Sequence, residues 1–472
     1  MALNPASEEF TALLADSVPA AALQLPADAF SLDLRGRFTG QDGFVIAPSD
    51  SDEVARIVRL CHQWQVPLVP VGGATGLVAG HLAQDLPRPV IVSSARMNRI
   101  RGISPGASII TAEAGCTLQS IQQAAASVGR IFPMALASKG SCHIGGNLAT
   151  NSGGALTIKH GNMRDLCLGL EVVLPDGRIW NGLSGLRKDN QGYDVRNLLI
   201  GSEGTLGIIT AASLRLTRPP VERIAALAAV RNPATARELL EFILDRFGDM
   251  LTAFELLSRT GFEFLAETGS NFHQPFSELP RWAVLIDIGS SCEFGLVDKF
   301  ADDLSLAAEK SLIEDAVIAD NAARIEKMWE MREAIPEANR RIGSVSSHDI
   351  AVPIESIAEF IAEADNSVAA IGEFRINCFG HMGDGNLHYN VFPLPGESSD
   401  RTARKRIMDS IHALVRSYGG SISAEHGTGR AKAAELKRYS DPAFFDTLRQ
   451  IKSALDPIGI MNPGAVLEQA LD

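Results

Sequence analysis

Cysteines are few in this chain, and they are scattered. Its 472 residues contain six, and no two of them form the C-x-x-C pair typical of zinc sites, iron–sulfur clusters or c-type haem attachment. Long apolar runs are also missing. No stretch approaches the ~20 consecutive apolar residues of a membrane span, and no basic segment precedes an apolar core at the N-terminus. We therefore expect reduced cysteines, no membrane span and a cytoplasmic protein.

Positive charge is scarce as well. The chain has 43 Lys and Arg against 56 Asp and Glu, which gives a net charge of -13. Nucleic acids and anionic membranes attract clustered Lys and Arg, so this balance disfavours both as partners. Hydrophobic residues make up 46% and charged residues 21%, as in soluble globular proteins. A chain of this length is too long for one ordinary core, so we expect two or three domains.

Two patterns of secondary structure follow one another along the chain. Residues 44–71 predict a strand, a helix capped by Ser51 and a second strand, and further strands are expected at 89–94, 109–115, 168–180 and 206–217. The pair Pro219-Pro220 resists both helix and central strand, so we place a domain boundary near residue 220. Beyond it, helices predicted at 234–247 and 324–342 mix with strands at 281–289 and 373–381, a pattern suited to an antiparallel sheet with helices on one face.

Three glycine-rich segments lie in the first half: PVGGATGLVAG at 70–80, GSCHIGGNLATNSGGALTIKHG at 140–161, and GSEGTLGIIT at 201–210. Glycines let backbone N–H groups converge on an anion, which is how main chain holds a phosphate. The first segment lacks the G-K-[ST] of a P-loop and the G-x-G-x-x-G of a dinucleotide fold, and taken alone it is equally well a plain turn. Three such loops together indicate a cofactor with phosphate and heteroaromatic parts.

The motifs P-x-G-G-x-T-G-L, I-G-G-N-x-A-T-N-x-G-G and G-S-E-G-T-L-G-I-I-T resemble those of FAD-linked D-2-hydroxy-acid dehydrogenases with a vanillyl-alcohol-oxidase-type FAD-binding domain. The likeness runs from about Val45 to the end of the chain. It implies an α+β fold with a two-part FAD-binding domain. We expect an N-terminal helical extension over 1–37, the FAD-binding domain over 38–220, a substrate or cap domain with an antiparallel sheet over 221–420, and a C-terminal helical segment over 421–472 that returns to the FAD domain.

The resemblance also assigns cofactor residues. It implies that the pyrophosphate is held by Gly72, Gly73, Thr75, Gly76 and Leu77; that Gly145, Gly146, Asn147, Thr150 and Asn151 lie along the isoalloxazine and ribityl; and that Glu203, Gly204 and Ile208 lie near the adenine. Pro70 and Asn462 complete the expected set. Relatives with covalent flavin at the first loop carry His after the Gly-Gly, where this chain has Ala74. We therefore expect noncovalent FAD.

Two histidines frame a polar turn in the apolar segment CFGHMGDGNLHYN, residues 378–390. If Asp384 and Gly385 are the central pair of a two-residue turn, His381 faces His388 on the neighbouring strand. Directly opposed residues have Cβ atoms roughly 4.5–5.5 Å apart, so both rings reach one ion. This spacing favours a metal site about as much as a structural histidine pair.

Glu425 and His426 are neighbours in the glycine-bounded segment SAEHGTGRAK. One of them could complete a two-histidine, one-carboxylate set with open positions, as found with zinc and redox-active first-row metals. The resemblance divides the roles: its motifs H-x-G-D-G-N-x-H and E-H-G supply His381, His388 and Glu425 as metal ligands and His426 as the catalytic base. We expect a divalent metal, zinc first, with manganese, cobalt or iron as alternatives.

The substrate implied by the resemblance is a D-2-hydroxy acid, D-2-hydroxyglutarate first and D-lactate next. Arg332 matches the arginine of the family's W-x-x-R-E motif and would pair with the substrate carboxylate. Asn390, on the same strand face as His388, is a second candidate. Members that prefer 2-hydroxyglutarate carry Thr and Lys where this chain has Pro336 and Ser347. Lys327, Arg340 and Arg341 are therefore alternative cations for a second carboxylate.

The reduced flavin needs an outlet for electrons. The chain has no iron–sulfur or haem motif, so we expect an external acceptor: an electron-transfer flavoprotein, a quinone or a cytochrome. A homodimer is the expected assembly if one forms. Two other readings stay open at this point. One is a metallohydrolase in which two histidines and Glu425 activate water, and the other is a non-catalytic flavin-binding subunit.

Overall fold

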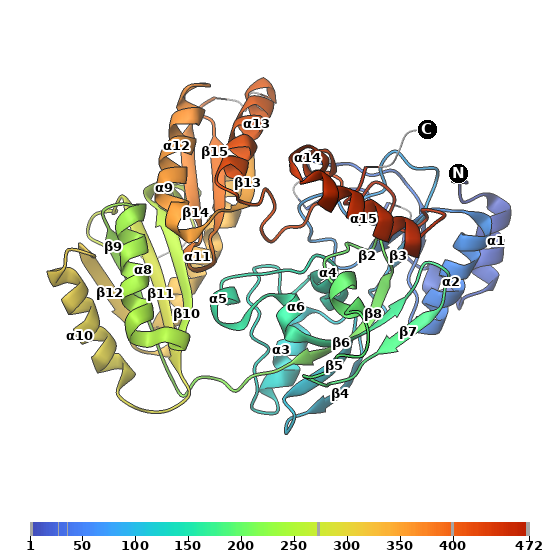
Figure 1. Cartoon of the computed structure of the whole chain (residues 1–472), viewed down its shortest axis with the longest axis horizontal. Helices are drawn as coiled ribbons and strands as arrows, with labels where there is room; N and C mark the ends of the chain where they lie inside the picture. The colour runs from blue at the N-terminus through green and yellow to red at the C-terminus, as the bar shows by residue number, and fades with distance from the viewer. Residues whose placement is uncertain (1–2, 27, 35, 271–273, 398–400, 469–472) are drawn as a thin grey trace. The chain divides into compact units, whose positions relative to one another are not determined.

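The structure is a computed structural model of the chain, and it describes residues 3–26, 28–34, 36–270, 274–397 and 401–468. The described residues form two compact units (Figure 1). The FAD unit, as it is named below, comprises Met1–Gly153, Gly161–Arg218 and His426–Asp472, and the sheet unit comprises Gly154–His160 and Pro219–Glu425. The chain thus leaves the FAD unit and returns to it. The division into four domains drawn from the sequence stays a prediction.

The FAD unit begins with a small parallel sheet. The predicted strand–helix–strand over 44–71 is confirmed as β1 (Phe44–Ile46), α2 (Ser51–Trp64) and β2 (Leu68–Val71). The strand β3 (Val90–Ser93) lies between β1 and β2, parallel to both. The predicted cap was wrong by one residue: Asp50 caps α2 by accepting the N–H of Glu53, and Ser51 is the first helical residue. The helix α1 (Glu8–Asp16) packs on α2.

A five-stranded antiparallel sheet forms the second layer of this unit, in the order β4-β5-β8-β6-β7. Its strands are β4 (Ile100–Ser104), β5 (Ile109–Glu113), β6 (Cys167–Val173), β7 (Ile179–Gly182) and β8 (Ile208–Arg215). The helices of this part are α3 (Leu118–Ala126), α4 (Ile144–Ala149), α6 (Met163–Leu166), α7 (Val195–Leu199), α14 (Ala433–Tyr439) and α15 (Pro442–Leu455), with a 3-10 turn η1 (Ala20–Leu23). Every strand predicted in this half is present.

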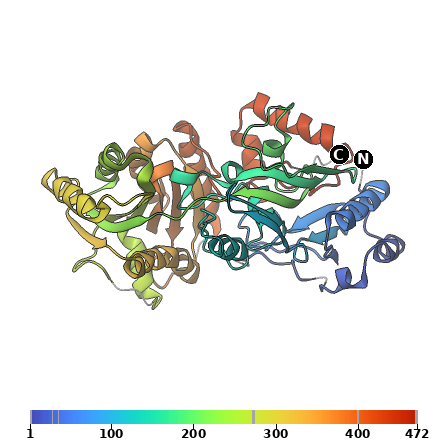
Figure 2. The ribbon, with the colours of Figure 1, turned by 90° about the horizontal axis from the view of Figure 1, so that it is seen from below.

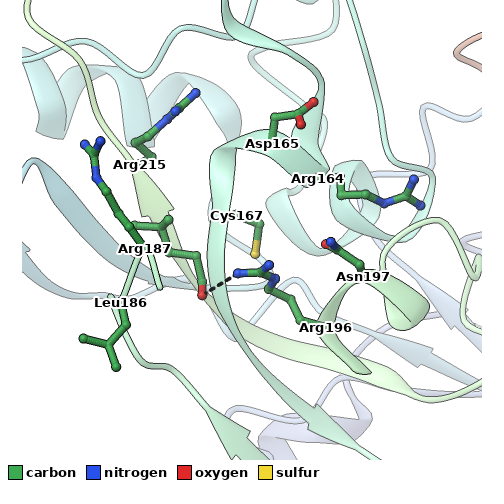
Figure 3. Close-up of a pocket in the computed structure, with 9 residues that line it drawn as sticks. Arg164, Asp165, Cys167, Leu186, Arg187, Arg196, Asn197 and Arg215 are labelled. Carbon is green, nitrogen blue, oxygen red and sulfur yellow. Dashed lines mark hydrogen bonds between the residues drawn. The ribbon is translucent and has the colours of Figure 1, made fainter. Parts of the chain in front are cut away.

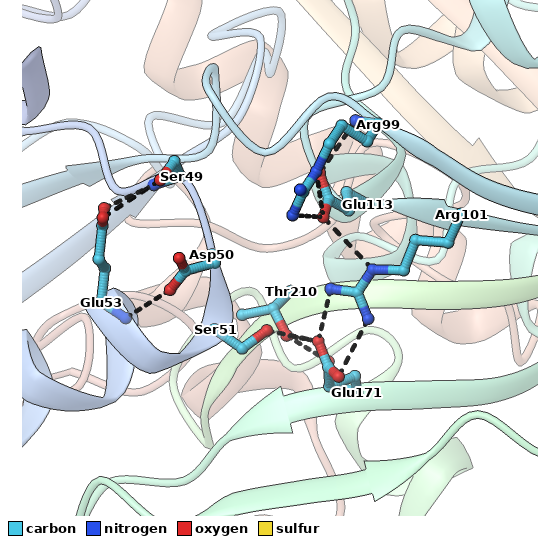
Figure 4. A network of polar contacts seen from close by, with 9 residues as sticks. All are labelled: Ser49, Asp50, Ser51, Glu53, Arg99, Arg101, Glu113, Glu171 and Thr210. Carbon is cyan, nitrogen blue, oxygen red and sulfur yellow. Dashed lines mark hydrogen bonds and ion pairs between the residues drawn. The ribbon is translucent and has the colours of Figure 1, made fainter.

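A buried ion network joins α2 to the antiparallel sheet (Figure 4). Arg101 on β4 donates to Glu113 at 3.3 Å and to Glu171 on β6 at 3.1 and 3.0 Å. Ser51 and, at 2.9 Å, Thr210 also donate to Glu171. Burial raises the pKa of the Glu171 carboxyl, but the bonds from Arg101, Ser51 and Thr210 outweigh it and hold that pKa below its usual value. Glu171 is therefore ionised, and its hydrogen bonds connect the two layers of the FAD unit.

We expect Glu171→Gln to lower the free energy of unfolding by about 2 kcal/mol, because Arg101 loses its partner in a largely buried network. The pKa of Glu171 is lowered by folding, so its contribution is full above the unfolded value near 4.5 and fades as the pH falls further. Urea denaturation at pH 7 and pH 4 measures both effects. Asp176→Asn, which loosens the exposed Arg178–Asp176 pair, is the control and should cost less than about 0.5 kcal/mol. Equal losses in the two variants would contradict this role.

The C-terminal segment completes the FAD unit. Ile460 and Asn462 pair with the edge of β2, where the Leu68 N–H donates to the Ile460 carbonyl at 2.8 Å and the Asn462 N–H donates to the Leu68 carbonyl at 2.7 Å. The Lys452 ammonium on α15 donates to the Thr205 carbonyl at 2.7 Å. Residues some 400 positions apart thus share one sheet edge.

The sheet unit is built on seven strands in the order β12-β9-β11-β10-β14-β15-β13, all antiparallel. These are β9 (Glu222–Val230), β10 (Leu251–Ser258), β11 (Trp282–Ser290), β12 (Asp315–Ala319), β13 (Ser346–Ala351), β14 (Arg375–His381) and β15 (Asn386–Phe392). The helices are α5 (Thr157–His160), α8 (Pro233–Phe247), α9 (Arg259–Glu267), α10 (Leu296–Glu309), α11 (Ala322–Ile342), α12 (Ile357–Ala369) and α13 (Arg401–Ser417), with 3-10 turns η2 (Gly248–Met250), η3 (Ile354–Ser356) and η4 (Met382–Asp384).

Helices cover both faces of this sheet rather than the single face that the sequence predicted (Figure 2). Alternate side chains of each strand feed two cores: Leu256 lies in the core under α8, α10, α12 and α13, and Leu257 in the core under α9 and α11. The second face is the one that carries the polar residues described below. In the described part of the chain, no helix combines the length and apolar character needed to cross a membrane.

Candidate active site and cofactor loops

The first glycine loop follows β2 directly and packs on the second. A Cβ added to Gly73 would lie 1.9 Å from the Ser141 carbonyl oxygen, so only glycine permits this approach. A Cβ added to Gly72 would lie 3.4 Å from the Gly146 Cα, an ordinary van der Waals contact, so the two loops are also close at this point. The remaining residues expected here, Thr75, Gly76 and Leu77, are half-buried in the same loop, after Pro70 at the end of β2.

The second loop contains the short helix α4, with Gly145, Gly146 and Asn147 inside it. Thr150 ends the helix, and its hydroxyl donates to the Gly146 carbonyl at 3.1 Å. Asn151 follows with a φ of 49°, a left-handed conformation that asparagine tolerates well. Its side-chain oxygen accepts the Arg164 N–H at 2.9 Å, which fixes the end of the loop.

The third loop, Gly201 to Ile208, joins the other two. The Glu203 N–H donates to the Ala149 carbonyl at 2.8 Å, and a Cβ on Gly204 would meet Pro70 at 2.8 Å. The Glu203 carboxylate is buried and accepts the N–H groups of Thr428 and Gly429 at 2.7 and 2.8 Å. Burial raises its pKa to about 7, although those two N–H groups act the other way.

Asn462 bonds the C-terminal segment to the first and third of these loops. Its amide donates to the carbonyls of Gly80 and Glu203 at 3.0 and 2.8 Å, and its oxygen accepts from Arg430 at 2.8 Å. The structure therefore gathers all the expected cofactor residues in one part of the FAD unit. The glycine positions leave backbone, rather than side chain, along the loops, which suits a phosphate-bearing cofactor.

The histidine turn lies in the sheet unit, with a register other than the predicted one. Phe379 pairs with His388, and His381 pairs instead with Glu255 of β10. The expected two-residue turn is wrong because η4 adds a 3-10 turn that ends at Gly385, with a φ of 83°. The register shifts by two residues, and side chains alternate with period two, so the face is preserved. The two imidazole centroids lie 5.5 Å apart.

Both imidazoles approach one carboxylate oxygen. The Nε2 atoms of His381 and His388 lie 3.8 and 3.4 Å from Oε1 of Glu425. Asp349, on β13, contributes to the same group: its ligand atom and those of His388 and Glu425 all lie within 4.8 Å of one another. Two imidazole nitrogens and carboxylate oxygens at these distances suit a divalent transition metal such as zinc or manganese.

A second ring of carboxylates orients the histidines. The His381 Nδ1 and the Glu255 Oε1 are 2.6 Å apart, and the His388 Nδ1 lies 3.9 Å from the Asp349 Oδ1. Asp349 also accepts the Glu425 N–H at 3.0 Å. Metal-binding histidines usually have such a carboxylate on the other ring nitrogen, because it fixes the tautomer and the ring orientation. His381 has this arrangement, with Glu255 as the carboxylate.

Glu255 also holds the expected substrate arginine. The Arg332 Nε, from α11, donates to the Glu255 Oε2 at 2.7 Å, and the guanidinium lies over the Phe379 ring. Burial raises the pKa of Glu255, but the charges of His381 and Arg332 outweigh it and lower it to about 2. Burial likewise lowers the pKa of His381, and Glu255 with Glu425 reverses that effect and raises it well above its usual value.

Asn390 lies on β15, and its amide donates to the His388 carbonyl at 3.1 Å. Its cross-strand partner is the buried Asn377, which bonds to Ser258 and, at 2.8 Å, to Asn339 of α11. A polar row therefore continues from the histidines along the α11 face. His426 follows Glu425 in the chain and is the first residue of the returning FAD-unit segment.

Sequence reasoning missed Glu255 and Asp349. The strand LTAFELLS carries Glu255 as its only charged residue, and a lone buried charge requires a partner. This lone charge was the feature of the sequence that could have indicated a buried ion pair. Asp349 belongs to the strand SSHDIA and gave a similar hint.

The chain matches known proteins along most of its length. Residues 43–182 match the family model of the FAD binding domain, and residues 219–466 match that of the C-terminal domain of FAD linked oxidases. The chain is 35% identical over 443 residues to a probable mitochondrial D-2-hydroxyglutarate dehydrogenase of Oryza sativa subsp. japonica, covering 93% of this chain and 78% of the relative. It is 34% identical over 466 residues to a D-2-hydroxyglutarate dehydrogenase of Xanthomonas citri pv. viticola, covering 96% of each.

Solved structures with the same fold include p-cresol methylhydroxylase with substrate bound, at a TM-score of 0.75 and 15% identity over 100% of both chains. A second is 4-ethylphenol oxidase from Gulosibacter chungangensis, at a TM-score of 0.74 and 19% identity over 99% of both. At these identities the likeness concerns the fold.

One expectation is overturned by the relatives. Those from rice, Arabidopsis thaliana, cattle and rat are all named as mitochondrial proteins, so the cytoplasmic location expected from the sequence is wrong. The expected fold and the expected cofactor agree with the matches. The chain belongs to the family of FAD-linked oxidases, and it is an FAD-dependent oxidoreductase with an α+β fold of the vanillyl-alcohol-oxidase type.

Proposed function

We propose that this enzyme oxidises a D-2-hydroxy acid to the 2-oxo acid, with D-2-hydroxyglutarate as the preferred substrate and D-lactate next. The names of relatives at 34–35% identity support the substrate class. The observation that carries the site is the approach of two imidazole Nε2 atoms to one Glu425 oxygen, at 3.8 and 3.4 Å. Those relatives are dehydrogenases by name, which leaves the metallohydrolase reading without support.

The flavin, the metal and the residues of the chain have separate roles in the proposed reaction. FAD, when bound noncovalently by the three loops, supplies the two-electron acceptor. A divalent metal, when held by His381, His388 and Glu425, supplies a Lewis acid. The chain itself binds and orients the substrate: Arg332, whose Nε is fixed by Glu255, keeps its terminal N–H groups for the substrate carboxylate. His426 takes the proton of the α-hydroxyl. An external acceptor, such as an electron-transfer flavoprotein, a quinone or a cytochrome, then receives the electrons.

The direct test mixes the FAD-loaded protein anaerobically with D- and L-2-hydroxy acids and follows flavin absorbance near ~450 nm. We expect loss of absorbance with D-2-hydroxyglutarate, a slower loss with D-lactate and none with the L-acids. Prior treatment with a chelator should suppress the loss, and added zinc or manganese should restore it. Bleaching that persists after metal removal would refute metal assistance, and bleaching by L-acids alone would refute the stereochemistry.

A second carboxylate on the substrate needs a cation. Arg340 and Arg341 are poor candidates, because both pair with Glu337 on the exposed side of α11, and Lys327 is exposed. Lys159 is better placed. It is half-buried on α5, which packs against β10 and η4, next to the His381 turn.

Lys159 makes no ion pair among the described residues, and its ammonium donates to the Gly289 carbonyl at 3.1 Å. We expect Lys159→Met to raise the KM for D-2-hydroxyglutarate about tenfold, as loss of one charged hydrogen bond does. The KM for D-lactate, which has no second carboxylate, should stay within about twofold. Steady-state kinetics with both acids measures this, and Lys327→Met is the matched control. An equal rise for both acids would exclude Lys159 as the distal contact.

A further inference from the structure

A cavity of about 320 Å³ in the FAD unit is lined by four arginines from four separate segments (Figure 3). Arg164 comes from α6, Arg187 from the connection after β7, Arg196 from α7 and Arg215 from the end of β8. The acidic residue in the lining is Asp165, and its carboxylate already accepts the N–H of Asn162 at the start of α6. None of these residues is among those assigned to the flavin or to the substrate.

The lining of the cavity is basic, whereas the chain as a whole is acidic, with 43 basic and 56 acidic residues. Arg99 and Arg101, elsewhere in the unit, pair with the carboxylates of Glu113 and Glu171. In the cavity, by contrast, Arg164 and Arg187 make no ion pair with any described residue. Two of the arginines that line the cavity therefore have no carboxylate partner among the described residues.

Hydrogen bonds within the protein hold part of this arginine lining in place. The Arg196 guanidinium donates to the Leu168 carbonyl at 3.0 Å and to Asp194 at 3.2 Å, so its position is fixed. Its Nε, like that of Arg164, is buried without an acceptor in the described part of the chain. Both Nε atoms are closed to solvent, so an anion in the cavity would meet the terminal N–H groups of the arginines rather than these atoms.

The size of the cavity limits the ligand. A volume of about 320 Å³ lies at the small end for ligand sites. Guanidinium groups match phosphate and carboxylate oxygens through paired N–H donors. Four of them around one space suit an anion with more than one charged group. Cys167 and Arg196 lie beside each other in the middle of the lining residues (Figure 3), so the anion would lie next to this arginine.

We propose that this cavity is a second ligand site, which binds a small oxyanion bearing two or more phosphate or carboxylate groups. The site is independent of the substrate site in the sheet unit. Because the Arg164 N–H is bonded to Asn151 of the second glycine loop, the bound anion also stabilises that loop.

Calorimetric titration of the FAD-loaded protein tests the proposal, with inorganic pyrophosphate and citrate as separate probes. We expect saturable binding of at least one of them with one site per chain. Tighter binding of pyrophosphate identifies a phosphate ligand, and tighter binding of citrate a polycarboxylate. Arg187→Gln removes an exposed arginine that makes no hydrogen bond to the part of the chain that the structure describes, and it should weaken binding about tenfold.

Lys188→Gln is the matched control, because it changes the net charge equally at an exposed residue outside the cavity lining. It should change affinity less than about twofold. His388→Ala should leave binding intact, which separates this site from the proposed metal centre. Equal weakening by the two charge variants, loss of binding in His388→Ala, or the absence of saturable binding by both probes would each overturn the proposal.

Discussion

Replacing His388 with alanine is expected to lower kcat/KM for D-2-hydroxyglutarate about 1000-fold, because a bound metal acting as Lewis acid is worth several kcal/mol to such a reaction. The change removes the Nε2 atom that lies 3.4 Å from Glu425 and leaves two of the three proposed ligands. Bound metal, measured by elemental analysis after dialysis, should fall together with activity. FAD content, measured by absorbance, should be unchanged.

His62→Ala provides the control for this experiment. His62 lies on α2 of the FAD unit, bonds to the Pro175 carbonyl and is not one of the proposed ligands. Its replacement should leave metal content and kcat/KM within about twofold of the parent enzyme. If His388→Ala kept its metal, or lost its metal and kept its activity, the proposed centre would be wrong.

Glu255→Gln is the second change with a large expected effect. It removes the single buried carboxylate that bonds to both Arg332, at 2.7 Å, and His381, at 2.6 Å. We expect the free energy of unfolding to fall by about 3 kcal/mol, since the arginine charge is left buried without its partner. Activity should fall about 10- to 100-fold, as is usual when the carboxylate behind a metal-binding histidine is removed.

The sign of the pH dependence follows from the direction of the shift. Folding lowers the pKa of Glu255 from 4.5 to about 2, so its stabilising contribution is complete above about pH 4.5 and is lost only as the pH falls toward 2. The Glu255 carboxyl itself therefore adds no pH dependence from pH 5 to 8. Glu255 also raises the pKa of His381, and the stability that this gives is full below the unfolded value near 6.5 and fades at higher pH, so the difference between parent and variant should be largest near pH 5 to 6 and smaller at pH 8. Urea denaturation across this range measures it.

Glu337→Gln is the matched control for this change. Its carboxylate also bonds to two arginines, and its pKa is also lowered to about 2, chiefly by the hydrogen bond from Arg340. Those groups are exposed on α11, so the same substitution should cost less than about 1 kcal/mol. A loss at Glu337 as large as that at Glu255 would show that burial is not the cause.

Local patterns predicted most of the secondary structure. The helix α2 and the strands of the FAD unit other than β4 follow directly from apolar periodicity and turn residues. The helix α11 was predicted despite Pro336, and the structure continues the helix through it. Covering of both faces of the large sheet was missed, because a strand pattern alone does not tell which helix packs on which face.

In the candidate site, too, local motifs were predicted and contacts between distant residues were not. The histidines and Glu425 were found because each lies in a short motif. The register of β14 and β15 was wrong because turn length depends on η4, which a Gly-Asp-Gly sequence does not specify. Glu255 was missed because its role depends on Arg332 and His381, 77 and 126 residues away. Such pairings are set by tertiary structure.

The return of the chain to the FAD unit has a consequence for biosynthesis. During translation, the edge of β2 and the carboxylate of Glu203 lack their partners until Thr428, Gly429 and the segment Ile460–Asn462 have been made, long after the residues that they contact. The sheet unit, by contrast, emerges as an almost continuous insertion and can close first. The cofactor loops therefore gain their final support only when the chain has been made as far as Asn462.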